Sequence, residues 1–129
     1  MTTIQESAPS RCPAPIYETE PTELLEMMER TPDRVFVMDI QDSGIFDGGH
    51  IPGARNVRFE DVKAASSELP KDRTVVIYCE DVSCGLPLCA ALELAELGFC
   101  AKYLHGGLEA WSRKEFPVEA SPPSPAPEY

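Results

Sequence analysis

Runs of apolar residues along the chain predict three buried strands. Residues 35–39 and 74–78 are rich in β-branched and aromatic side chains and carry no charge before Asp39, which is typical of strands covered on both faces. A shorter run over residues 101–104 has the same character. Each of these runs is too short for an ordinary helix, so a strand is favoured.

Helices are predicted between and beside these strands. After Pro21, two leucines and two methionines are interspersed with glutamates, which predicts a helix that ends near Thr31. Residues 88–97 are apolar on most sides and stop at Gly98, as expected of a helix that other elements cover, with Pro87 in its first turn. A last helix is predicted over residues 107–114.

Alternating strands and helices with near-continuous apolar strands predict an α/β fold, with a parallel sheet flanked by helices on both faces. Both ends of the chain are rich in proline, which predicts a flexible arm over residues 1–15 and a flexible tail over residues 120–129. The remaining segment, residues 16–119, has the length of one domain.

Composition narrows the classes of partner. The net charge is −11, from 11 basic and 22 acidic residues, without a cluster of lysine or arginine, which argues against nucleic acid. No apolar stretch approaches the ~20 residues of a membrane helix, and the N-terminus lacks the pattern of a signal peptide. We expect a cytoplasmic protein without a membrane partner, whose five cysteines stay reduced and form no disulfide framework.

Cys79 is the main candidate for chemistry. In a parallel sheet reactive groups collect at the carboxyl ends of strands, and two polar markers lie there, Asp39 and Cys79. The loop that follows, residues 79–85, leads into a helix, so its amides and the helix dipole are expected to lower the pKa of the Cys79 thiol. From position alone, Cys79 could equally be a small buried residue at the end of a strand.

The other cysteines are assigned by their neighbours in sequence. Cys84 lies in the same loop and could be a resolving thiol, an alternative nucleophile or a bystander. Cys89 and Cys100 lie among leucines and Phe99, which favours core packing. The spacing of Cys79, Cys84 and Cys89 does not match the close pairs of zinc sites, so neither a metal nor a cofactor is expected.

The two histidines and the tryptophan are predicted to be structural. His50 lies in a turn rich in glycine and proline, where bonds to the backbone or to a carboxylate, Asp39 or Asp47, are expected. His105 precedes two glycines and is predicted to be a turn residue. Trp111 is predicted to pack under the last helix.

Together these segments resemble the rhodanese-like family. The resemblance lies in residues 37–41 followed by Phe46 and by Gly-His-Ile-Pro-Gly-Ala over residues 49–54, in residues 75–79 with the helix end at 97–99, and in residues 104–107 followed by Trp111. It covers residues 18–118 in the family's order and implies a central parallel sheet of about five strands.

The resemblance also implies a reaction. Cys79 would take a sulfane sulfur from thiosulfate or a persulfide, hold it as a persulfide, and pass it to cyanide or a thiol. The backbone amides of the loop would hold the sulfur: Glu80, Asp81, Val82, Ser83, Cys84 and Gly85. Asp39, His50 and Gly53 would belong to the structural motif. The partners would be a small sulfur donor or acceptor, or a protein thiol or persulfide.

The chain departs from the family pattern in its charges. Glu80 and Asp81 stand beside the thiol and no basic residue occurs from 79 through 101, which should raise the pKa of the thiol and disfavour thiosulfate. Without an arginine in the loop, phosphatase chemistry is not expected. Gln41 replaces an arginine of the first signature, so a stabilising pair is expected to be lost.

Two other functions remain open from the sequence. The chain could be a non-catalytic binding or regulatory module that uses the fold and the proline-rich ends. It could instead be a redox switch, in which Cys79 and Cys84 form a reversible disulfide.

Overall fold

The computed structural model describes residues 18–80 and 84–120. The predicted arm and all but residue 120 of the predicted tail lie outside this part, so the domain boundaries stay a prediction. The strands are β1 (Glu18–Thr19), β2 (Val35–Asp39), β3 (Arg55–Asn56), β4 (Thr74–Tyr78) and β5 (Cys100–Leu104). The helices are α1 (Pro21–Arg30), α2 (Ser43–Gly48), α3 (Val62–Ala65), α4 (Leu86–Glu96) and α5 (Gly107–Arg113). Short 3-10 helices cover Pro32–Arg34, Phe59–Asp61 and Ser66–Glu68.

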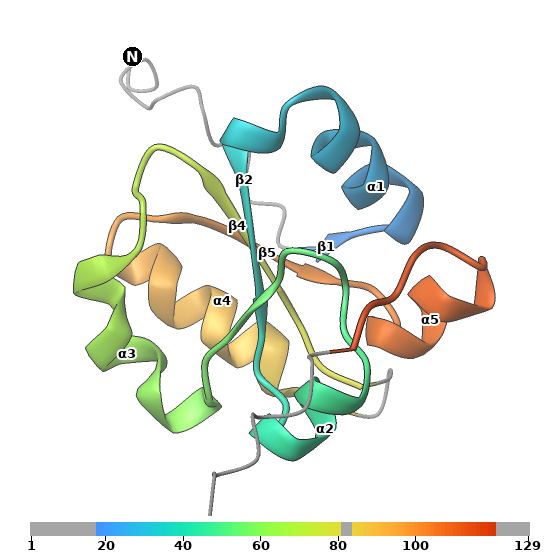
Figure 1. The fold of residues 1–129 in the computed structure, drawn as a ribbon. Helices are drawn as coiled ribbons and strands as arrows, with labels where there is room; N and C mark the ends of the chain where they lie inside the picture. The colour runs from blue at the N-terminus through green and yellow to red at the C-terminus, as the bar shows by residue number, and fades with distance from the viewer. Residues whose placement is uncertain (1–17, 81–83, 121–129) are drawn as a thin grey trace, which may run out of the picture.

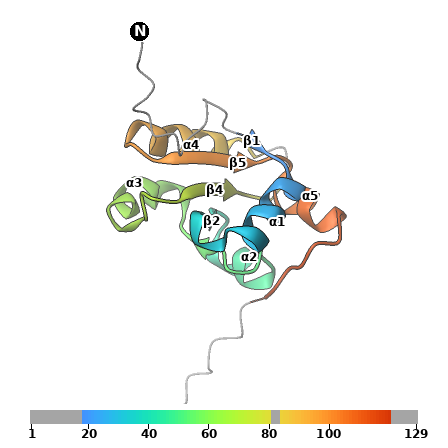
Figure 2. The ribbon, with the colours of Figure 1, turned by 90° about the horizontal axis from the view of Figure 1, so that it is seen from above.

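All strand pairs in the sheet are parallel, in the order β1-β5-β4-β2-β3. β5, β4 and β2 lie side by side in this order in Figure 2. The three strands expected from the sequence form the centre, and the two-residue strands β1 and β3 form the edges. The α/β fold class is confirmed.

Helices cover both faces of the sheet, with α3 and α4 on one side and α1 and α5 on the other (Figure 1). Side chains of the central strands alternate between the two cores: Val75 and Ile77 pack with α3 and α4, whereas Val76 and Tyr78 pack with α1 and α5. Because both faces are buried, β2 and β4 are apolar at nearly every position. Among the described residues, no helix has the length and apolar character needed to cross a membrane.

Local sequence explains how α1 and α5 begin. Pro21 is the first residue of α1 and follows a capping box. In this box the Glu20 side chain accepts the backbone N–H of Glu23, and the Glu23 side chain accepts the backbone N–H of Glu20. Before α5, Gly106 has φ +76°, and a Cβ there would lie 2.5 Å from the Cβ of Ala110. A glycine is therefore required where the chain turns from β5 into α5.

The prediction that other elements cover α4 is wrong. Its buried stripe consists of Pro87, Ala90, Ala91 and Leu94, while Leu86, Leu88 and Leu92 are about two-fifths exposed and Cys89 is exposed. Cys89 is therefore not a core residue, whereas Cys100 is buried as expected. A helix that is apolar all round does not show from its sequence which side is buried.

Candidate active site

Cys79 follows β4 directly, between the ends of β2 and β5. The first turn of α5 fixes its backbone, because Leu108 N–H donates to the carbonyl of Cys79 and Glu109 N–H donates to that of Glu80, each at 2.9 Å. The Cys79 side chain is half-buried and packs against the core under α4. The fold thus presents this thiol at the carboxyl edge of the sheet, as the sequence predicted.

The thiol lines a pocket of about 260 Å³. Three predicted loop residues belong to its wall, namely Cys79, Cys84 and Gly85, whereas Glu80 does not, and Asp81, Val82 and Ser83 lie outside the described residues. Sequence reasoning did not place the rest of the wall: Glu18, Pro87, Leu88, Tyr103, Leu104, His105, Gly106 and Gly107. No lysine or arginine is found among these described lining residues.

The Cys79 thiol is protonated at neutral pH. Burial is the first cause that raises its pKa, to about 12, and a hydrogen bond with Cys84 and the charge of Asp39 act in the same direction. The Glu80 backbone amide, bonded to the sulfur, opposes this rise. Burial therefore outweighs the lowering of the pKa by the Glu80 amide. Asp81, Val82 and Ser83 lie outside the described residues, so the effect of the loop as a whole stays a prediction.

The Cys84 thiol shares the pocket with Cys79 and is hydrogen-bonded to it. It is half-buried. This contact brings the two thiols together, as a resolving thiol or an alternative nucleophile requires.

Asp39 is fully buried and anchors a polar network beside the site. Its carboxylate accepts from the Gln41 backbone amide at 2.8 Å and from Gln41 Nε2 at 2.9 Å. Burial raises the pKa of Asp39, and hydrogen bonds from Tyr78 and Gln41 oppose the rise. Gln41 lacks the charge of the arginine that it replaces, but its neutral amide donates a hydrogen bond to Asp39.

His50 makes the predicted bond to nearby backbone, but the carboxylate beside it is not one of the two that were expected. Its Nδ1 lies 2.7 Å from the Phe46 carbonyl oxygen, and its ring stacks on that of Phe46. The nearby carboxylate is that of Glu119, 3.4 Å from Nε2, rather than Asp39 or Asp47. Gly53 has φ +83° in the following turn, which favours glycine there.

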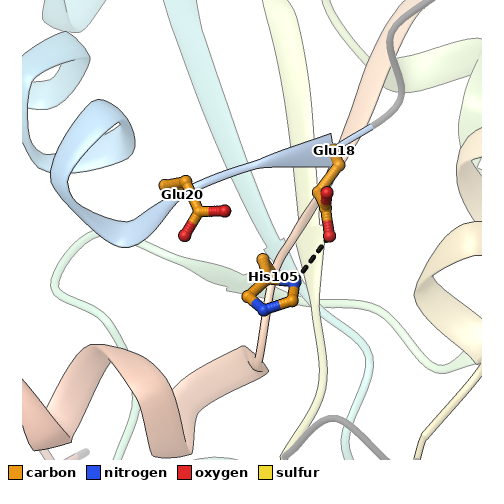
Figure 3. A group of neighbouring side chains, drawn as sticks. All are labelled: Glu18, Glu20 and His105. Carbon is orange, nitrogen blue, oxygen red and sulfur yellow. Dashed lines mark hydrogen bonds and ion pairs between the residues drawn. The ribbon is translucent and has the colours of Figure 1, made fainter.

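His105 lies on the pocket wall, where the sequence predicted only a turn residue. Its Nδ1 is 2.5 Å from Oε2 of Glu18, which comes from β1 at the sheet edge (Figure 3). The hydrogen bond with Glu18 raises the pKa of His105. Glu18 and His105 are distant in sequence. Their contact could have been predicted only from the pairing of β1 with β5, which brings the two residues together.

Glu20 also lies near His105 (Figure 3), and ligand atoms of Glu18, Glu20 and His105 lie within 4.8 Å of one another. All three residues are exposed, and the histidine nitrogen is already bonded to Glu18. We therefore assign the group to an ion pair and not to a metal centre.

Comparison with known proteins places this site in a family. The family model described as "Rhodanese-like domain" matches residues 20–114. A sulfurtransferase of Allochromatium vinosum is 32% identical over 81% of this chain and 96% of its own length. The thiosulfate sulfurtransferase GlpE of Shewanella oneidensis is 34% identical over 69% of this chain and 85% of its own length.

A solved structure agrees with the sequence matches. The BH2092 protein of Bacillus halodurans superposes with a TM-score of 0.76 at 28% identity, covering 81% of this chain and 77% of that chain. The fold, the strand-end cysteine and the sequence matches lead to one conclusion: the chain belongs to the rhodanese-like domain family.

Proposed function

We propose that the protein is a sulfurtransferase or persulfide carrier in which Cys79 holds the transferred sulfur. The observation that carries the proposal is the Cys79 thiol in a pocket of about 260 Å³, with the Glu80 amide bonded to its sulfur. Backbone amides stabilise a sulfur anion at this place. The sulfurtransferases among the relatives support the same reaction class. We place the protein in the cytoplasm, where thiols stay reduced.

In the proposed reaction no net oxidation occurs. The Cys79 sulfur attacks the outer sulfur of a donor R–S–SH, the S–S bond of the donor breaks, and R–SH leaves with the proton of Cys79. Cys79 then carries –S–SH. An acceptor thiol or cyanide takes the outer sulfur in a second step, which restores the Cys79 thiol.

The charges around the pocket favour a neutral or singly charged donor. Glu18 belongs to the described wall and no lysine or arginine does, while Glu80 and Asp81 follow the cysteine. Thiosulfate carries two negative charges and is repelled by such a site. A small persulfide or a protein-bound persulfide is therefore the donor class that we propose.

Intact mass of the reduced protein, followed over time with thiosulfate or with cysteine persulfide, tests this proposal. We expect one added sulfur atom, gained faster from the persulfide. The double variant Glu80→Gln/Asp81→Asn should reduce the difference between the loading rates from the two donors. Glu29→Gln, which removes an exposed charge on α1, should leave that difference unchanged. Equal or faster loading from thiosulfate contradicts the charge argument. No sulfur from either donor would favour the non-catalytic binding module.

The hydrogen bond between the Cys79 and Cys84 thiols favours a second candidate function, a redox switch. We expect mild oxidation to join Cys79 and Cys84 in a disulfide that dithiothreitol reverses. Peptide mapping after alkylation of the remaining thiols measures this, and Cys89→Ala is the matched control because Cys89 is exposed outside the pocket wall. If oxidation leaves both thiols free to be alkylated, the switch is excluded.

A further inference from the structure

The protonated Cys79 thiol requires a proton acceptor before it can attack a donor. Its pKa is about 12, so the thiolate is scarce at neutral pH. A base in the same pocket would remove this obstacle. The pocket wall contains one histidine among its described residues, His105. This inference rests on the proposed function and adds a residue to its mechanism.

Strand order brings His105 beside Cys79. β4 and β5 are parallel neighbours with Ile77 paired to Tyr103, and Cys79 and His105 each lie two residues beyond this pair. Adjacent strands are about 4.8 Å apart, and Cys79 and His105 each follow directly after the last residue of their strand. Both residues line the same pocket.

Glu18 holds the imidazole from the other side. β1 pairs with β5 with Glu18 opposite Tyr103, and the Glu18 carboxylate is bonded both to His105 Nδ1 and to the Tyr103 hydroxyl. A carboxylate on Nδ1 fixes the ring so that Nε2 is the free nitrogen, and it stabilises the imidazolium that forms when Nε2 takes a proton. Glu18 of β1, His105 after β5 and Cys79 after β4 thus supply carboxylate, imidazole and thiol from three neighbouring strands.

We propose that His105, oriented by Glu18, accepts the proton of the Cys79 thiol during sulfur loading and returns it to the leaving thiol. Cys79–SH and neutral imidazole give thiolate and imidazolium. The thiolate bonds to the outer sulfur of R–S–SH, the donor S–S bond breaks, and the imidazolium protonates the departing R–S⁻. His105 is then neutral again, and the products are Cys79–S–SH and R–SH.

The surroundings of His105 set the pH at which this base works. The charged or titratable groups around it come from β1, the start of α1, β5, the end of β4, the loop before α4, and α5: Glu18, Glu20, Tyr103, Cys79, Cys84, Arg113 and Lys114. The hydrogen bond with Glu18 is the largest influence and raises the pKa of His105. Loading should therefore increase with pH through a value above the ordinary pKa of histidine, ~6.5.

The test compares wild type, His105→Gln, Glu18→Gln and Glu29→Gln by two readouts between pH 5 and about 10, in the presence of EDTA to remove any bound cation. One readout is loading from cysteine persulfide. The other is alkylation of Cys79 by iodoacetamide, which requires no sulfur transfer. For His105→Gln we expect loading about 100-fold slower at pH 7, with a deficit that shrinks as pH rises. The pH profile of its Cys79 alkylation rate should lose the inflection that we assign to His105.

Two further variants separate a chemical role from a structural one. Glu18→Gln should move the inflection to lower pH, because the group that raises the pKa of His105 is gone. Free imidazole should restore part of the loading rate of His105→Ala and should not change that of wild type. Glu29→Gln should match wild type in both readouts.

The possible failures can be told apart. If wild type gains sulfur and His105→Gln does so at the same rate with the same pH profile, this inference is overturned and the proposed function stands. If wild type gains no sulfur from any donor while its alkylation still depends on His105, the proposed function fails and the proton acceptor stands.

Discussion

Replacing Cys79 with alanine is expected to abolish sulfur loading entirely. Cys79 is the cysteine at the strand end with a backbone amide bonded to its sulfur. Of the other described cysteines, Cys84 lines the same pocket, Cys89 is exposed outside the pocket wall and Cys100 is buried in the sheet. Without Cys79, no other thiol combines the pocket with that amide among the described residues. Intact mass after incubation with cysteine persulfide should show no added sulfur.

The matched variant is Cys84→Ala. The Cys79 thiol loses a hydrogen bond that raises its pKa, so the thiolate fraction at neutral pH increases. Loading of this variant should be at least as fast as that of wild type. Sulfur retained in Cys79→Ala and lost in Cys84→Ala would instead identify Cys84 as the nucleophile. Sulfur retained in both variants would contradict a single loading site at the strand end.

The central strands could be predicted because burial on both faces leaves a visible pattern. β2 and β4 are apolar at nearly every position. β1 and β3 contain only two residues each, all polar, so they have no hydrophobic pattern to detect. The position of Cys79 followed from β4 alone. The edge strands become apparent only when their backbones pair with β5 and β2.

The residues that line the pocket with Cys79 could not be predicted in the same way. Glu18 and His105 are joined through the pairing of β1 with β5, and a contact across so many residues has no local signal. His50 shows the same limit, since its carboxylate partner, Glu119, comes from the far end of the domain. Sequence motifs located the strand-end cysteine that we propose as the nucleophile, and tertiary pairing determined which charges surround the pocket.

Trp111→Ala is expected to destabilise the domain by about 3–5 kcal/mol. Trp111 is fully buried in the core under α1 and α5, its ring packs edge-on against Phe116, and its Nε1 donates to the Pro117 carbonyl at 2.7 Å. A loss of this size is a large share of the ~5–15 kcal/mol typical of a domain. Urea denaturation followed by circular dichroism measures it, because the protein has a single tryptophan and fluorescence is lost with the substitution.

Trp111→Phe separates packing from the hydrogen bond. It keeps an aromatic ring in the core and loses the N–H that Pro117 accepts, so we expect a smaller loss, about 1–3 kcal/mol. The same helix holds the site, since Leu108 and Glu109 donate to the carbonyls of Cys79 and Glu80. Sulfur loading by the folded fraction of Trp111→Ala should therefore also fall. If the free energy of unfolding of Trp111→Ala differs from that of wild type by less than about 1 kcal/mol, Trp111 does not anchor α5. The proposed dependence of the Cys79 loop on packing around Trp111 is then wrong.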